Sequence, residues 1–214
     1  MRASVIVPNY NGRRFLDTCL GALFRQTYPP ERLEVVLVDD ASTDDSVAWV
    51  REHYEGVKIV ALASNSGLAA GCNAGARAAT GDLLVMLNND TEAEPGWLAA
   101  LVEAASAHPE AGAIASKMLL FDRREVLHNA GDLMGADGIP RNRGVWEVDE
   151  GQYDAHEEVF GGCGGGVAYR RAAWEAAGGF DERLFMYLED VDLAWRLQLL
   201  GWREIGRASC RERV

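Results

Sequence analysis

Apolar runs and polar stops alternate regularly through the first half of the chain. Short apolar runs, typical of strands buried on both faces, are followed by stretches with apolar positions at helical spacing. The expected strands are Ala3–Val7, Glu34–Val38, Val57–Leu62 and Leu83–Leu87. The expected helices cover about 15–24, 43–54, 68–79 and 96–107, the second capped by Ser42 or Thr43 and the last opened by Pro95. This repetition predicts a parallel sheet covered by helices on both faces.

The pattern becomes less regular after about Ile114. The stretch 125–148 is rich in Gly, Asp and Arg, which predicts loops with short strands. Beyond it the expected elements are a strand through Tyr169, a helix from Arg171 to Gly178-Gly179, a helix over about Glu189–Leu200, and a strand after Gly201-Trp202. We therefore expect one domain over 1–203, with a nucleotide-type half of about 1–113 and a second half of about 114–203.

Composition and net charge limit the kinds of molecule that the protein can bind. The 214 residues suit a single domain with a substantial core. The formal net charge of -12 argues against a nucleic acid or an anionic membrane surface as the main partner, so a phosphate ester would need a bridging cation. No apolar run approaches the ~20 residues of a transmembrane helix, and no signal peptide precedes the first strand. The four cysteines lack zinc spacing and are interpreted as reduced thiols: Cys19, Cys72, Cys163 and Cys210.

Polar clusters follow three of the expected strands. They are Pro8-Asn9-Tyr10, Asp39-Asp40 and Asn88-Asn89-Asp90. Each one alone is more typical of a turn or a helix cap, but ligands of parallel sheets bind beyond the carboxyl ends of the strands, where all three clusters lie. The Asp40 carboxylate can accept a hydrogen bond from a base N–H. Asp90 offers the hard oxygen ligand that magnesium or manganese prefers.

Two further stretches have both a structural and a functional interpretation. The run Gly161–Gly166 (GGCGGG) indicates a bulge, or a wall that lets a substrate lie close to the main chain. Three carboxylates in four residues, Glu189, Asp190 and Asp192, suit a first helical turn because of the helix dipole. Their mutual repulsion also tends to raise a pKa, which favours a general base. No role is assigned to the histidines His53, His108, His128 and His156.

The phosphate-binding glycine motifs are missing from the sequence. Neither GxGxxG nor GxxxxGK(S/T) occurs, so a dinucleotide dehydrogenase and a P-loop enzyme both lose their main support.

Taken in order, these motifs resemble the family 2 glycosyltransferases of the GT-A fold, particularly their rhamnosyltransferase-like branch. The matching stretches are SVIVPNYNG, EVVLVDDASTDDS, NSGLAAGCNAGARAATGDLLVMLNNDT, GGCGGGVAYRRAAWEAAGGFDE and FMYLEDVDLAWRLQLLGW. The resemblance implies an α/β, Rossmann-like fold with a mostly parallel central sheet. It also implies an inverting transfer of a sugar from a dTDP-, UDP- or GDP-linked donor to an acceptor hydroxyl. The acceptor expected is a glycan or lipid-linked glycan of the bacterial envelope, glycosylated in the cytoplasm, at the inner face of the plasma membrane.

The resemblance also implies roles for individual residues. Asp190 matches the catalytic base of the ED motif, with Glu189 beside it. Asp90 matches the metal-binding position of the DxD motif, whose first position is Asn88 here, and the cofactor implied is Mg²⁺ or Mn²⁺. Asp40 matches the base-recognition aspartate. The full set expected at the donor nucleotide is Pro8, Asn9, Tyr10, Asp40, Asn65, Asn73, Asn88 and Asn89.

Two other functions stay open at this point. One is a nucleotide-sugar-binding fragment without turnover. The other is a sugar-nucleotide pyrophosphorylase, although that chemistry requires a Gly-rich loop with Arg and Lys after the first strand, and PNYNGRRF is a poor match.

The end of the sequence differs from the rest. Residues 204–214 (EIGRASCRERV) have no apolar periodicity and resemble the conceptual translation of a short-read sequencing adapter. We expect these residues to be a non-native tail on a truncated chain, since the family continues with a further strand and helix.

Overall fold

The structure is a computed structural model that describes residues 1–155 and 157–213, with the side chains of 157 and 207–213 left undescribed, so His156 lies outside the described residues. Its helices are α1 (Arg13–Phe24), η1 (Pro30–Arg32), α2 (Ser46–His53), α3 (Gly67–Ala78), α4 (Trp97–Ala107), α5 (Arg171–Ala177), η2 (Glu182–Leu184) and α6 (Glu189–Leu199). Its strands are β1 (Ala3–Asn9), β2 (Leu33–Asp39), β3 (Lys58–Ala61), β4 (Leu83–Leu87), β5 (Glu92–Ala93), β6 (Ala111–Leu119), β7 (Leu127–Asn129), β8 (Asp132–Met134), β9 (Pro140–Asn142), β10 (Glu157–Glu158), β11 (Gly166–Arg170) and β12 (Arg203–Arg213).

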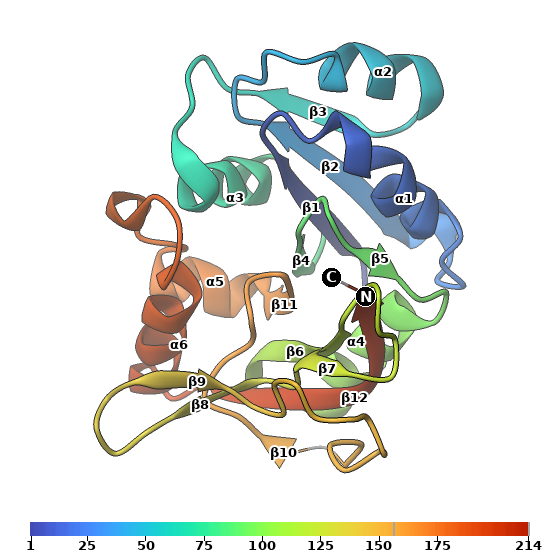
Figure 1. Cartoon of the computed structure of the whole chain (residues 1–214). Helices are drawn as coiled ribbons and strands as arrows, with labels where there is room; N and C mark the ends of the chain where they lie inside the picture. The colour runs from blue at the N-terminus through green and yellow to red at the C-terminus, as the bar shows by residue number, and fades with distance from the viewer. Residues whose placement is uncertain (156, 214) are drawn as a thin grey trace.

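One twisted sheet runs through the molecule (Figure 1). Its strand order is β10-β12-β6-β11-β4-β1-β2-β3, with β5 paired to β12 and β7 to β6. Strands β4, β1, β2 and β3 are parallel to one another, which confirms the parallel sheet expected for the first half. Strand β11 lies antiparallel between β4 and β6, so the carboxyl end of β6 returns to the same edge as the carboxyl ends of β1 and β4.

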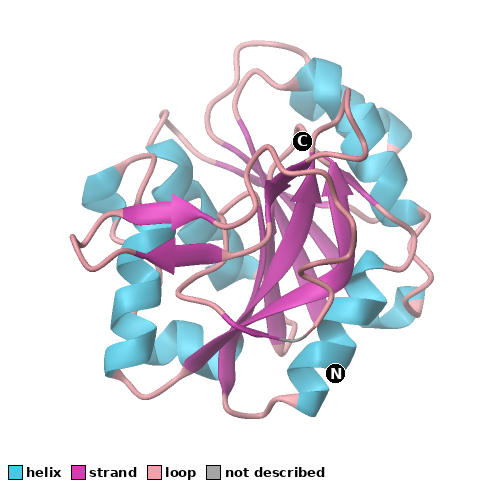
Figure 2. Cartoon of the chain, turned by 60° about the horizontal axis from the view of Figure 1, so that its bottom comes forward, coloured by secondary structure: helices cyan, strands magenta, loops and turns pink. Residues whose placement is uncertain are grey.

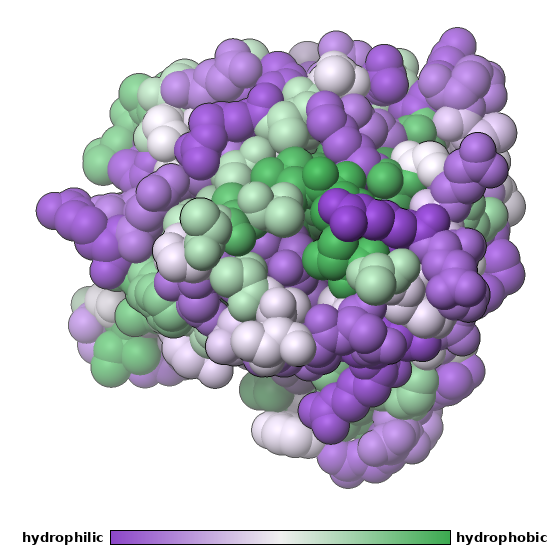
Figure 3. Space-filling view, turned by 90° about the horizontal axis from the view of Figure 1, so that it is seen from above, coloured by the Kyte–Doolittle hydropathy of each residue, from purple (hydrophilic) through white to green (hydrophobic). Residues whose placement is uncertain are grey.

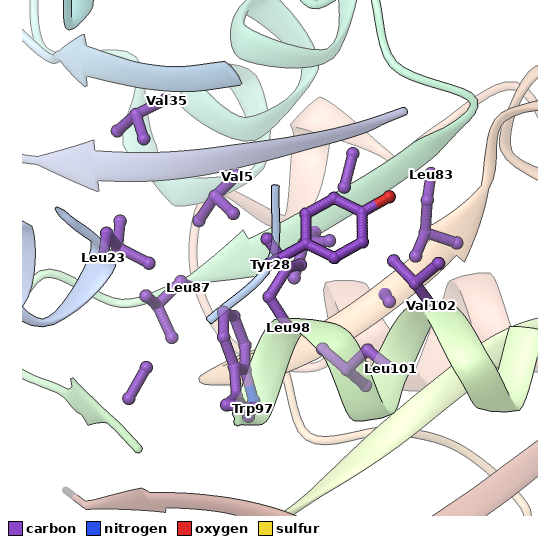
Figure 4. Packing of buried hydrophobic residues seen from close by; sticks show 14 of the residues in the cluster. Val5, Leu23, Tyr28, Val35, Leu83, Leu87, Trp97, Leu98, Leu101 and Val102 are labelled. Atoms are coloured by element: carbon purple, nitrogen blue, oxygen red, sulfur yellow. The ribbon is translucent and has the colours of Figure 1, made fainter. Parts of the chain in front are cut away.

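Successive side chains of the strands face two separate cores. Val5 and Val7 of β1 pack with α1 and α4, whereas Ile6 between them packs with α3, α5 and α6. Figure 4 shows the first core, where Trp97 and Leu101 of α4 lie under the sheet. Both faces are covered, as continuous apolar strands require.

The start of α2 differs from the expected position. The helix begins at Ser46 and neither Ser42 nor Thr43 caps it, so that expectation is wrong. The Thr43 backbone N–H donates to Asn11 Oδ1 at 2.7 Å, and Asp44 Oδ1 accepts from the Ser46 N–H at 3.1 Å. The bond to Asn11 holds the β2–α2 turn against the β1–α1 loop. The bond from Ser46 to Asp44 stabilises the turn, so the helix begins only at Ser46.

The strand expected after Gly201-Trp202 is present as β12, parallel to β6. Ile205 belongs to the first core and Glu204 is buried, so the folded sheet extends past the boundary expected at residue 203. The non-native origin of residues 204–214 stays a prediction, which reading the genomic locus across this point tests.

The segment between β7 and β11 is mostly loop, with the short β8–β9 pair set apart from the long strands (Figure 2). Lys117 of β6, 1% exposed, donates through Nζ to Asp149 Oδ1 at 2.9 Å and to Asp154 Oδ1 at 2.7 Å. A buried ammonium requires such partners, and removing one of them would be strongly destabilising. These bonds fix the loop segment to the main sheet.

The face drawn in Figure 3 carries many hydrophilic side chains, with a group of apolar side chains among them. Within the described residues, no helix has the length and apolar character needed to cross a membrane. The longest run of exposed apolar side chains in the second half is Leu184–Leu188, a segment we call the strap.

Candidate active site

A pocket of about 290 Å³ lies at the carboxyl ends of β1, β2 and β4. We call it the strand-end pocket. It brings together Asp90 and every residue expected at the donor nucleotide except Asn73. Its lining is Pro8, Asn9, Tyr10, Asp40, Asn65, Gly67, Leu68, Gly71, Asn88, Asn89, Asp90, Phe185 and Met186.

The amides of this pocket join the strand ends. Asn89 Nδ2 donates to Asn9 Oδ1 at 2.8 Å, and Asn9 Nδ2 donates to Asp39 Oδ1 at 3.1 Å. A Cβ on Gly12 would lie 2.1 Å from Asn89 Nδ2, so only glycine fits beside this pair. The Asn89 side chain that follows β4 and the Asn9 side chain at the end of β1 therefore link the ends of β4, β1 and β2.

Asp40, only 7% exposed, holds the beginning of α3. Its Oδ1 accepts from the Ser66 N–H at 2.7 Å and its Oδ2 accepts from the Gly67 N–H at 2.9 Å. Each carboxylate oxygen keeps a second acceptor site, so the same group can still receive a base N–H from the pocket. The sequence did not predict this contact between Asp40 and the helix.

Asp90 is exposed at the mouth of the strand-end pocket. Among the side chains that the structure describes, no three of His, Cys, Asp or Glu converge in a way that could hold a metal ion alone. Magnesium and manganese sites that use one carboxylate and complete their coordination with water and substrate phosphate fit this arrangement. The residues present are therefore consistent with a metal carried in together with a diphosphate.

His128 of β7 was given no role from the sequence, but it lies within the electrostatic reach of Asp90. Burial lowers the pKa of His128, and the negative charge of Asp90 opposes that shift in part. Its Nδ1 is buried and has no hydrogen-bond partner among the described residues. The His128 imidazole therefore lies near the carboxylate at the pocket mouth, where burial favours its neutral form.

A second hollow, the α6 cleft, has a volume of about 340 Å³. It is formed by the glycine run, the β8–β9 segment and the start of α6. Its lining is Leu68, Asn88, Asp132, Pro140, Asn142, Cys163, Gly164, Gly165, Tyr187, Leu188, Glu189, Asp190 and Val191. Leu68 and Asn88 line both hollows, so the strand-end pocket and the α6 cleft meet there.

The two acids of the ED pair have different surroundings. Asp190 is half-buried, with Oδ2 accepting from the Gly164 N–H and Oδ1 from the Val191 N–H, both at 2.8 Å. Glu189 is 3% exposed, and its Oε2 is buried without a hydrogen-bond partner among the described residues. Asp190 is thus oriented at the cleft surface, while Glu189 lies behind it.

Carboxyl groups crowd this end of the molecule. Burial, followed by the charge of Asp190, raises the pKa of Glu189 to about 7. Burial raises the pKa of Glu204 to about 8 and that of Asp132 to about 6, and Asp190 adds to both shifts. The glycine run allows this crowding, since a Cβ on Gly164 would lie 3.2 Å from Asp190 Oδ2. The sequence predicted repulsion within the ED pair but not the contributions of Asp132 and Glu204, which come from distant strands.

The strap lies between the two hollows. Phe185 and Met186 line the strand-end pocket, whereas Tyr187 and Leu188 line the α6 cleft. No sequence signal assigned these side chains to a site, although the apolar run LFMYL directly before three acids was visible.

Asn73 is the one expected donor-site residue that lies outside the strand-end pocket. Its side-chain amide is buried and bonded to the backbone of Phe180 and to Glu182. The structure therefore does not place its polar atoms at the pocket surface.

Comparison with known proteins shows similarity over nearly the whole chain. The chain is 34% identical to the O-antigen biosynthesis protein RfbC of Myxococcus xanthus, over 98% of this chain and 17% of that protein. It is 29% identical to the N-acetylglucosaminyl-diphospho-decaprenol L-rhamnosyltransferase of Mycobacterium tuberculosis, over 94% of this chain and 72% of that protein. The chain thus spans less than a fifth of the first relative and about seven-tenths of the second.

The fold has solved counterparts. The mannosyltransferase PcManGT of Pyrobaculum calidifontis, solved with GDP-Man and Mn²⁺, superimposes with a TM-score of 0.74 at 24% identity. The match covers 100% of this chain and 56% of the mannosyltransferase chain, which confirms the GT-A fold expected from the sequence. Residues 4–177 match the family model described as glycosyl transferase family 2, and the chain belongs to that family.

Proposed function

We propose that the chain transfers a sugar from a nucleotide diphosphate sugar to an acceptor hydroxyl, with inversion at the anomeric carbon. The observation that carries this proposal is the meeting of the two hollows at Leu68 and Asn88. A donor in the strand-end pocket would point its sugar toward the α6 cleft, where Asp190 lies. An acceptor in that cleft would then stand between the sugar and the base.

Asp190 is the proposed general base. Its two backbone hydrogen bonds, from Gly164 and Val191, fix the carboxylate at the cleft surface. It accepts the proton of the acceptor hydroxyl while that oxygen forms a bond to the anomeric carbon and the bond to the diphosphate breaks. A single displacement of this kind inverts the configuration.

Glu189 is a second acid beside Asp190, and its charge changes near neutral pH. With a pKa of about 7, Glu189 is largely protonated in weakly acidic solution and ionised above neutral pH. Ionisation of Glu189 therefore adds a second negative charge beside the Asp190 carboxylate as the pH rises through neutrality.

At the donor end, the nucleotide diphosphate would be held by the strand ends. Asp40 offers acceptor oxygens to a base N–H, and Asn65 and Tyr10 line the same pocket. Asp90 would hold a divalent metal together with the diphosphate oxygens and water. Such a cation would supply charge stabilisation for the departing diphosphate, since no Lys or Arg is among the residues that line the strand-end pocket.

The relatives indicate the substrate class. One is named for O-antigen biosynthesis and another for rhamnosyl transfer to a decaprenol-linked sugar, so we propose an envelope glycan or a lipid-linked glycan as the acceptor and a dTDP-, UDP- or GDP-linked sugar as the donor. Cytoplasmic action at the inner face of the plasma membrane is part of this proposal.

The test is to incubate the protein with Mn²⁺ and each of UDP-glucose, GDP-mannose and dTDP-rhamnose, and to identify the released product. Release of the nucleoside diphosphate, increased by an added polyprenyl-diphosphate acceptor, supports the proposal. Release that depends on pyrophosphate and yields a sugar phosphate would instead indicate a pyrophosphorylase. Binding of a nucleotide sugar without any release would indicate a binding fragment without turnover.

A further inference from the structure

One face of α3 holds the segment that leads into the strap and α6. Three residues four positions apart along this helix make the contacts. The Ala69 N–H donates to the Phe185 carbonyl at 3.1 Å, and Arg77 Nη1 lies 3.5 Å from Glu182 Oε1. Between them, the Asn73 side chain bonds to the turn formed by Phe180 to Glu182. Helix α3 begins at the strand-end pocket, so this face connects that pocket to the start of α6.

Asn73 makes the most complete of these contacts. Its Nδ2 donates to the Phe180 carbonyl at 2.9 Å and to Glu182 Oε1 at 3.0 Å, while its Oδ1 accepts from the Phe180 N–H at 3.0 Å. Gly179, with φ of 72°, fits closely against it, since a Cβ there would lie 2.7 Å from Asn73 Oδ1. Both ends of the amide are therefore used to hold this turn, and an aliphatic replacement would leave the buried Phe180 groups unpaired.

The strap that follows this turn has a strained backbone. Phe185, Tyr187 and Leu188 have φ values of 58°, 72° and 66°. At Phe185 the Met186 N–H donates back to the Leu184 carbonyl at 2.6 Å, which closes a strained γ-turn. Residues in such conformations persist only where the surrounding structure holds them. The anchor at Asn73 is part of what holds the strap.

The strained strap ends directly at the proposed base. Leu188 is the N-cap residue of α6, and Asp190 is the second residue of that helix. Movement of the strap would shift the start of α6 and with it the Asp190 carboxylate. The hydrogen bonds that join the ends of β1, β2 and β4 do not include the strap, so this edge should stay in place, and only Phe185 and Met186 of the pocket lining belong to the strap.

We propose that Asn73 is a positioning residue for Asp190, which acts through the strap and does not touch the donor. This inference rests on the proposed function, in which Asp190 is the base. The resemblance in sequence implied that Asn73 contacts the donor, whereas the role proposed here is indirect.

The first test compares Asn73→Ala with the parent protein. Hydrogen–deuterium exchange of peptides covering 180–190 should become faster, while peptides covering β1, β2 and β4 stay unchanged. Nucleoside diphosphate affinity, measured by calorimetry with Mn²⁺ and the tightest binder among UDP, GDP and dTDP, should change much less than turnover, because only Phe185 and Met186 of the pocket lining belong to the strap. Turnover at saturating nucleotide sugar should fall roughly 10- to 100-fold, as expected for a misplaced catalytic group. Weaker nucleotide binding with unchanged turnover at saturation would overturn the proposal.

A second test uses a single and a double variant, and it applies even if Asn73→Ala folds poorly. Asn73→Asp places a carboxylate against the Glu182 carboxylate and should impair turnover, whereas Asn73→Asp combined with Glu182→Gln restores a hydrogen bond between the two positions. Turnover and slow exchange of 180–190 should recover together and in part in the double variant, because the carboxylate of the Asn73→Asp change still faces the Phe180 carbonyl. Recovery of slow exchange without recovery of turnover would overturn the positioning role.

Arg77→Ala is the matched control from the same helix face. It removes only an exposed ion pair, which contributes little, so turnover and exchange should stay close to those of the parent. A parent protein that neither binds a nucleoside diphosphate nor releases one from a nucleotide sugar would contradict the proposed function itself. A parent that does both, with an Asn73→Ala variant equal to it in turnover, would contradict only the role of Asn73.

Discussion

The strand-end pocket and the α6 cleft lie side by side but differ in the polar groups that line them. The first lies at the ends of parallel strands, and its amides are paired with one another, as in the bond from Asn89 to Asn9. The second is assembled from a glycine run, a loop segment and a helix start, and it gathers carboxyl groups whose pKa values are raised by burial. The pocket is preorganised by hydrogen bonds, whereas the cleft holds unfavourable charge, which suits proton transfer.

The first prediction separates the two regions by their roles in the reaction. Asp190→Asn keeps the size of the side chain but removes its ability to accept a proton, so turnover should fall by ~10²-fold or more. Nucleotide affinity should stay within about twofold, because the strand-end pocket is untouched. Steady-state rates and calorimetry on the same preparation measure both. An active Asp190→Asn variant beside an inactive Glu189→Gln variant would reverse the assignment within the pair.

The second prediction concerns the effect of the buried Glu189 carboxyl in the cleft on the free energy of unfolding. The pKa of Glu189 rises from its ordinary 4.5 to about 7 on folding, so the folded state binds this proton more tightly than the unfolded state. The resulting stabilisation is complete below about pH 4.5 and is lost as pH rises through about 7. Between pH 5 and 8 this group should lower the free energy of unfolding by on the order of 2 kcal/mol.

Glu189→Gln should flatten this pH dependence, which denaturant unfolding at several pH values measures. Glu52→Gln, at an exposed position of α2, is the matched control and should retain the slope of the parent. Equal slopes for the parent and the Glu189→Gln variant would show that folding does not raise the pKa of Glu189.

The third prediction tests the proposed metal end of the strand-end pocket. Asp90→Ala removes the exposed carboxylate at the pocket mouth, so Mn²⁺-dependent binding of the nucleoside diphosphate should weaken by roughly tenfold or more. Thermal stability should change little, since Asp90 is exposed. Calorimetry with and without Mn²⁺ measures the effect, and identical affinities in the variant and parent under both conditions would contradict it.

The smallest effect is expected within the amide pair itself. Asn89→Ala removes the hydrogen bond to Asn9 and should lower the free energy of unfolding by about 1 kcal/mol. Asn89→Asp should be more destabilising, because an acceptor oxygen would then face Asn9 Oδ1. Thermal unfolding ranks the two variants. An aspartate variant as stable as the parent would show that the pocket edge is not held by this bond.

The sequence by itself determined the order of the elements and the location of the strand-end pocket. Continuous apolar runs such as Leu83–Leu87 are buried on both faces, which predicts parallel strands, and parallel strands bring their carboxyl ends to one edge. Polar residues placed directly after those runs, such as Asn89 and Asp90, were therefore located without any coordinates. This reasoning works because apolar runs are read from neighbouring residues, and strands joined by a crossover helix in one sheet run parallel.

Only the tertiary structure decided which groups meet across the chain. Asn73 looked like a donor ligand from its motif, but its amide faces Phe180, 107 residues later. Asp132 lines the α6 cleft and Glu204 lies buried within the electrostatic reach of Asp190, and both come from strands far from Glu189 in the sequence, so their burial could not be read from their neighbours. Burial and hydrogen-bond partners depend on how whole elements pack, so the pKa shifts of the cleft and the anchoring of the strap follow from the fold and not from the motifs.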